Sequence, residues 1–206
     1  TCRFQSSDFF EIGSEWPFPF EVEGTYRLKD GALSVEVTGT NTGASNMPAG
    51  LGYHPYFPLP LLPSGDRSKC LVDLPCETYW PLREDSIPTG ERQPVGGDYD
   101  LRSRVAIGDR YYDDVWSGVQ AEEDGWSRCH FSDPEAGVQI VVQADSTFRE
   151  WVFFAPDHRP VVCYEPYTCA TDAVNLQGKG VDAGLAVLAP GQSLGGTMCF
   201  VPTATQ

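Results

Sequence analysis

Short runs in which apolar and polar residues alternate recur along this chain, and no stretch keeps a helical apolar period over three turns. In residues 21–28 the apolar side chains share one face of an extended strand and the charged ones the other. Asp30-Gly31 follows, a dipeptide that readily supplies the positive φ angles of a tight turn, and the alternation resumes over residues 32–40. This pattern predicts an antiparallel hairpin.

Further segments with strand composition are separated by clusters of turn residues. They are residues 70–74, 115–121, 128–132, 137–144, 151–155, 161–165, 185–188 and 195–201. Many short strands with few helices are typical of an antiparallel sandwich or barrel. Because no repeat or linker divides the chain, we expect one all-β domain over residues 1–206.

The longest segment without a clear pattern covers residues 75–110. Loops beyond about 15 residues in a compact domain are usually functional or disordered. This one carries Tyr79 and Trp80, and it also carries the oppositely charged Asp100 and Arg102. We therefore expect it to be ordered and to form the wall of a site.

The charge balance narrows the choice of partners. Lys and Arg total 14 against 29 Asp and Glu, which gives a formal net charge of −15. The electrostatic field of this net charge repels phosphate backbones and anionic lipid headgroups. In addition, no apolar run approaches the roughly 18 residues that a membrane helix needs. We expect neither a nucleic-acid nor a membrane partner.

Seven cysteines are scattered along the chain without a C-x-x-C pair, and an odd number does not suit a disulfide framework. This usage is typical of reduced, mostly buried thiols in a cytoplasmic protein. Nucleotide-binding glycine motifs, the Gly-x-Ser-x-Gly elbow and the zincin motif are also missing from the sequence. Three separated histidines do not suggest a metal site, so we expect neither a metal nor a cofactor.

His54 lies in the aromatic-rich segment 50–57, where two glycines and a proline impose an irregular backbone that packing alone seldom requires. A histidine beside aromatics can be either a packing residue or a catalytic one. His158 is expected in an exposed hairpin loop, and His130 in a strand without a chemical role.

Glu165 ends the apolar run 161–164, where desolvation raises the pKa of a carboxyl toward the working range of a general base. The alternative is a structural carboxylate tied to backbone amides. Asp113 and Asp114 begin a strand, so their side chains point to opposite faces and at most one enters a given cavity. A structural turn is the alternative role for both.

Five motifs in the same order resemble those of the aldose 1-epimerase (galactose mutarotase) family. They are residues 41–57, residues 88–90 with 99–102, residues 112–116, residues 164–168 with 175–176, and residues 188–193. The resemblance implies an antiparallel β-sandwich of the galactose mutarotase-like type. It also implies an isomerase that interconverts the α and β anomers of a free sugar, a hexose such as glucose or galactose, without a cofactor.

By position in these motifs, Glu165 would be the general base and His54 the general acid. Asp113 would bind sugar hydroxyls, with Asp114 as the alternative if the register differs by one residue. Aromatic side chains, among them Tyr53 and Trp116, would either stack on the apolar face of the sugar or pack in the core.

An arginine and a second histidine that the family normally brings from its N-terminal portion have no matching motif here. We therefore expect the chain to correspond to the C-terminal two-thirds or so of the family's fold. Two alternatives to the isomerase stay open. One is a non-catalytic carbohydrate-binding β-sandwich, and the other is a glycoside hydrolase that uses Asp113 and Glu165 as its carboxylate pair.

Overall fold

The structure of the protein is a computed structural model that describes residues 1–205. Its main regular elements are antiparallel strands, which form three sheets. The eight-stranded sheet contains, in spatial order, β1 (Cys2–Gln5), β2 (Phe20–Lys29), β3 (Ala32–Asn41), β16 (Ser193–Ala204), β12 (Val138–Ala144), β11 (Ser127–Asp133), β6 (Leu71–Asp73) and β9 (Val105–Ala106).

The six-stranded sheet contains, in spatial order, β5 (Tyr56–Pro58), β14 (Val161–Tyr167), β13 (Glu150–Ala155), β10 (Tyr112–Val119), β7 (Cys76–Trp80) and β8 (Gln93–Pro94). A small sheet pairs β15 (Ala186–Leu188) with β4 (Met47–Ala49). Two short helices, α1 (Phe10–Glu15) and α2 (Ala173–Gly178), complete the fold together with 3₁₀ turns at Ser6–Asp8, Arg67–Lys69 and Gly97–Tyr99.

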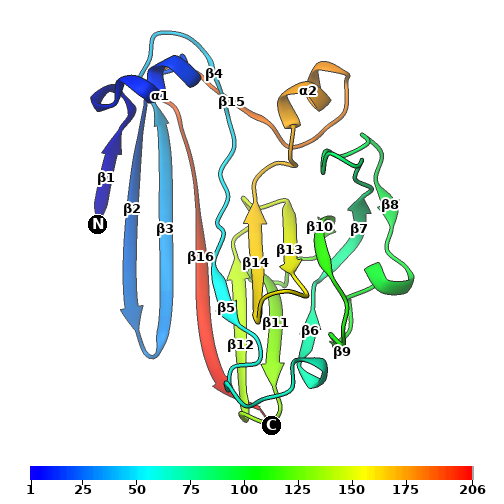
Figure 1. The fold of residues 1–206 in the computed structure, drawn as a ribbon. Coiled ribbons are helices and arrows are strands. Elements are labelled where there is room, and N and C mark those ends of the chain that lie inside the picture. The colour runs from blue at the N-terminus through cyan, green and yellow to red at the C-terminus, as the bar shows by residue number, and fades with distance from the viewer. Residues whose placement is uncertain (206) are drawn as a thin grey trace.

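The two large sheets pack face to face, and the core lies between them. Figure 1 shows β14 and β13 in front of β12 and β11, while the β2–β3 hairpin extends beyond the six-stranded sheet. Large side chains from both sheets share this core, among them Trp116, Phe153 and Tyr164 from one sheet and Phe131 from the other. The predicted all-β sandwich is therefore confirmed.

A second, smaller core covers part of the outer face of the six-stranded sheet. Trp80, Val115 and Val152 are neighbours across β7, β10 and β13, and Ala173 and Leu176 of α2 pack on them. Residues therefore alternate along each of these strands between the core of the sandwich and the outer face. The chemistry described below lies on that outer face, beside the α2 segment.

The predicted strands are all present, with ends that shift by three residues at most. The interpretation of residues 75–110 as irregular was wrong in part, because this segment contains β7, β8 and β9. The last two have only two residues each and lie at sheet edges, too short to show alternation. The segment is nevertheless ordered, as expected. Within residues 1–205, none of the helices is both long and apolar enough to cross a membrane.

The turn between β2 and β3 has the geometry that its sequence predicts. Asp30 and Gly31 have φ angles of 52° and 79°. An Ala at position 31 would have to hold a left-handed conformation, which costs roughly 1 kcal/mol. We expect Gly31→Ala to lower the free energy of unfolding by about that amount in urea denaturation. Gly13→Ala, in α1 with open space around it, is the control and should lower it little or not at all. Equal losses in the two variants would contradict the turn assignment.

Candidate active site

Glu165 lies on the outer face of β14, directly opposite Val152 of β13. Only 2% of its side chain is exposed, although it is ionisable. Tyr164 and Pro166, its neighbours in the strand, are also buried. Since strand residues alternate in direction, Tyr164 contributes to the core between the sheets while Glu165 points to the opposite side.

Backbone pairing with the end of β14 places His54 beside Glu165. Tyr53 N donates to Pro166 O at 3.2 Å, and Thr168 N donates to Leu51 O at 2.9 Å. Gly52, between them, forms a bridge with Tyr167. A Cβ at position 52 would come within 2.6 Å of the Tyr167 ring, so this close approach requires glycine.

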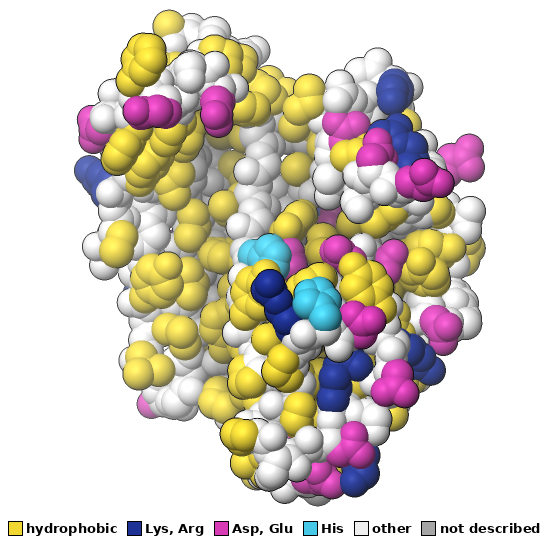
Figure 2. Space-filling view, viewed as in Figure 1, with side chains coloured by type: hydrophobic (Ala, Val, Ile, Leu, Met, Phe, Trp, Pro, Cys, Tyr) yellow, Lys and Arg dark blue, Asp and Glu magenta, His cyan; other side chains and the backbone are white. Residues whose placement is uncertain are grey.

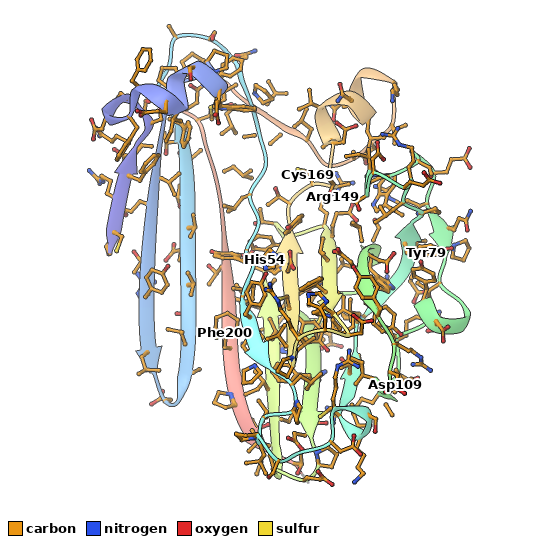
Figure 3. All side chains as sticks on the ribbon, in the orientation of Figure 1. His54, Tyr79, Asp109, Arg149, Cys169 and Phe200 are labelled. Atoms are coloured by element: carbon orange, nitrogen blue, oxygen red, sulfur yellow. The ribbon has the colours of Figure 1, made fainter. Side chains whose placement is uncertain are left out.

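The His54 imidazole is held in place from several sides. Its Nε2 lies 3.2 Å from Glu165 Oε1, and the ring stacks on Tyr56 with centroids 4.8 Å apart. Phe154 meets it edge-on at 6.5 Å. The side chain is nevertheless 47% exposed, and Figure 3 places it over the strands of the six-stranded sheet. In Figure 2 histidine and acidic side chains lie close together on this face. A ligand can therefore reach the pair from solvent.

The pair opens into a cavity of about 280 Å³. Its lining residues are His54, Tyr56, Leu82, Ser86, Asp113, Val115, Val152, Phe154, Glu165, Tyr167 and Thr171. This volume is close to the lower end of the range for small-molecule sites, which is about 300 Å³. The wall combines polar side chains such as Asp113 and Glu165 with apolar ones such as Val115 and Phe154, which suits a small ligand with hydroxyl groups. Leu82 and Ser86 belong to the 75–110 segment, which therefore walls this site as expected.

Burial raises the pKa of Glu165 to about 7, because the charged form loses water. Tyr167 Oη donates to Glu165 Oε2 at 2.9 Å, and this hydrogen bond lowers the pKa by a smaller amount. The nearby carboxylate of Asp113 raises it further. A carboxyl with this pKa can both accept and release a proton near neutral pH.

The structure distinguishes between the two adjacent aspartates. Asp113 lines the cavity with Glu165, while Asp114 points to the other side of β10, where its Oδ1 accepts a hydrogen bond from Tyr99 Oη at 3.2 Å. Burial raises the pKa of Asp114. Only Asp113 can therefore meet a ligand beside His54 and Glu165.

Two residues that the sequence suggested as sugar contacts lie elsewhere, so those predictions need correction. The hydroxyl of Tyr53 donates toward Val35 O and Gly196 O of the other sheet, each at 2.9 Å. Trp116 is fully buried in the core, and its Nε1 donates to Tyr99 O at 2.9 Å. Trp116 follows Asp113 by three residues on the same strand, so their side chains point to opposite faces and cannot enter the same cavity.

The remaining histidines do not join the site. His130 lies on β11 of the other large sheet, where its Nδ1 is 2.9 Å from Asp73 Oδ1. His158 is exposed in the loop before β14. Conversely, sequence reasoning missed Cys163 and Tyr167. Both lie two residues from Glu165 on β14, so all three side chains point to the same face of the strand. This spacing is the sequence signal that could have identified them.

The two packed sheets form a galactose mutarotase-like β-sandwich, and a histidine beside a buried glutamate lines a small cavity on the outer face of one sheet. The family model for aldose 1-epimerase matches residues 2–200. The chain therefore belongs to the aldose 1-epimerase family. Because the match extends over nearly the whole chain, the expectation that the resemblance is to the C-terminal two-thirds of the family is corrected.

Individual proteins also match parts of this chain. The uncharacterized protein YphB of Escherichia coli K12 is 23% identical over 182 residues, which are 85% of this chain and 58% of that protein. Human galactose mutarotase is 35% identical over 99 residues, 48% of this chain and 28% of that protein.

A galactose mutarotase-like protein from Clostridium acetobutylicum has the same fold, with a TM-score of 0.85 at 20% identity. The match covers 98% of this chain and 62% of that one. The chain thus spans less than two-thirds of the length of these relatives.

The raised pKa of Glu165 predicts a pH-dependent cost to stability. Between the ordinary value of 4.5 and about 7, folded Glu165 retains a proton that the unfolded chain releases, so stability falls as pH rises through this window. We expect Glu165→Gln to raise the free energy of unfolding at pH 8 by about 1–3 kcal/mol and to leave it unchanged at pH 4. Denaturant titrations at both pH values measure this. The exposed Glu123→Gln is the matched control, and an equal gain there would contradict the assignment.

Proposed function

We propose that this protein interconverts the α and β anomers of a free aldose by general acid–base catalysis. The observation that carries the proposal is the contact between His54 Nε2 and buried Glu165 Oε1 at the wall of a small polar cavity. Membership of the aldose 1-epimerase family supports it. The proposed substrate is a neutral hexose such as glucose or galactose, which the net charge of −15 does not repel.

Ring opening needs a base and an acid at two oxygens that share one carbon. In the proposed reaction, Glu165 takes the proton of the anomeric hydroxyl while His54 donates a proton to the ring oxygen. The C1–O5 bond breaks and C1 becomes an aldehyde. Rotation about C1–C2 and reversal of both transfers then gives the other anomer. Each of these two groups contributes about 10²–10⁴-fold when it is in the correct protonation state.

Asp113 is proposed to hold sugar hydroxyls, because its carboxylate lines the same cavity as the catalytic pair. Carboxylate oxygens accept hydrogen bonds from hydroxyl groups strongly. Tyr167 is proposed as a positioning residue, since its hydroxyl fixes the second oxygen of Glu165 and leaves Oε1 toward His54.

The proposal predicts that exchange depends on both members of the pair. Glu165→Gln and His54→Asn should each lower the anomer exchange rate by about 10²-fold or more, measured by NMR saturation transfer with glucose and galactose. Glu123→Gln and His158→Asn make the same chemical changes at exposed positions and should leave the rate unchanged. An unchanged rate in Glu165→Gln would contradict the proposal. Sugar binding without exchange above the buffer rate would favour the carbohydrate-binding module instead.

A second prediction concerns pH. Because the base must be ionised, the exchange rate should fall as pH drops below about 7, the pKa of Glu165. Tyr167→Phe removes a hydrogen bond that favours the carboxylate, so the pKa of Glu165 should rise and the acid limb should move to higher pH. The pH–rate profiles of both proteins measure this. A shift of the limb to lower pH would contradict the role given to Tyr167.

A further inference from the structure

A third side chain with metal-ligating chemistry lies beside the catalytic pair. Cys163 precedes Glu165 by two residues on β14, so both side chains point to the same face of the strand. Three ligand atoms lie within 4.8 Å of one another: a ring nitrogen of His54, the Sγ of Cys163 and a carboxylate oxygen of Glu165. Cys163 is fully buried and Glu165 is 2% exposed, whereas His54 reaches the surface. Neither the acid nor the base role requires this thiol.

The spacing of these atoms suits a tetrahedral cation. Zinc binds imidazole nitrogen and carboxylate oxygen at about 2.0–2.1 Å, which places two such ligands roughly 3.3 Å apart at a tetrahedral angle. His54 Nε2 and Glu165 Oε1 are 3.2 Å apart. A thiolate bound at about 2.3 Å would lie roughly 3.5 Å from each of them. The three ligand atoms already lie within 4.8 Å of one another. His54 and Glu165 already have the separation that a shared cation needs, and Cys163 Sγ lies near enough to complete the set by moving closer.

We infer that His54, Cys163 and Glu165 form a three-ligand zinc site, and that zinc bound there stops anomer exchange. Nitrogen, thiolate and carboxylate together are a donor set that favours Zn²⁺ over Mg²⁺ or Ca²⁺. When the zinc–sulfur bond forms, the Cys163 thiol loses its proton to solvent, and His54 binds as neutral imidazole. The fourth position faces the cavity, where a water molecule completes the coordination.

The charges around the cavity also favour a cation. Asp113 lines it, and among residues 1–205 the cavity lining contains no Lys or Arg. The inhibition part of the inference rests on the proposed function, because zinc would occupy the same atoms that take and give the protons. The binding part does not depend on it.

Metal binding is tested first without any sugar. The probe is Co²⁺, whose thiolate charge-transfer band and strong four-coordinate absorption report a bound cysteine, in a Cys2→Ser background that removes the exposed thiol. We expect one equivalent to bind with this band and Zn²⁺ to displace it. Cys163→Ser and Cys163→Ala should lose the band and bind at least about 100-fold more weakly, since even changes to outer-shell partners cost about 10–100-fold.

Controls make either outcome of the titration decisive. Cys199→Ser, which changes a partly exposed cysteine outside the cluster, should leave the spectrum and the affinity unchanged. His54→Asn alters an exposed side chain and should weaken Co²⁺ binding, so it tests the site even if both Cys163 variants fail to fold. The inference would be overturned if the protein with the intact site did not bind one equivalent of Co²⁺. It would also be overturned if the Cys163 and His54 variants bound Co²⁺ with full affinity.

Inhibition is tested separately by saturation transfer. Micromolar Zn²⁺ should abolish exchange in the Cys2→Ser protein, and about 100-fold more should be needed in Cys163→Ala, which keeps the catalytic pair. Equal sensitivity of the two proteins would overturn the inhibitory role. If no variant shows exchange, the proposed function fails, while the Co²⁺ titration still decides the metal site.

Discussion

The site depends on the backbone pairing between residues 51–53 and the end of β14. This pairing joins a loop that carries His54 to the strand that carries Glu165, and it works because Gly52 allows the Tyr167 ring to lie against the loop. Tyr53 strengthens it from the other side, since its hydroxyl bonds to two carbonyls of the eight-stranded sheet. A side chain that does not enter the cavity therefore ties the loop that carries His54 to both layers of the sandwich.

Burial of Glu165 raises the pKa of its carboxyl at the expense of stability. In water this carboxyl would stay ionised and be a weak base near neutral pH. On the covered outer face of β14 its pKa rises to about 7, which suits proton transfer but makes the charged form unfavourable in the fold. The Tyr167 hydroxyl offsets part of this cost and orients the carboxylate at the same time.

Much of the fold could be predicted because the alternation of residues reflects which face of a sheet is buried. The hairpin with Asp30 and Gly31 and the core strands followed from it, and so did the rule that only one of Asp113 and Asp114 can enter a cavity. The same rule shows that Trp116 and Asp113 point to opposite faces.

Other features had no periodic signal in the sequence. Tyr53 lies in an irregular loop, so its direction depends on contacts with strands far along the chain. The short edge strands β8 and β9 were missed because two residues show no period. Cys163 was overlooked for a different reason. Spacing along the chain does not relate this cysteine to His54, which approaches β14 from more than a hundred residues away in sequence.

Side chains along β14 alternate between the core and the site. Any insertion or deletion in this strand therefore affects both at once. Tyr164 fills the space between the sheets, while Cys163 and Glu165 point outward. Inserting or deleting one residue before Cys163 within this strand would turn Glu165 inward and bring Tyr164 to the cavity, unless a bulge absorbed the change. A carboxyl would then enter the aromatic core, so the same change would remove Glu165 from the cavity and destabilise the sandwich. A substitution in this strand can change one side chain at a time, whereas a change of length alters the core and the cavity together.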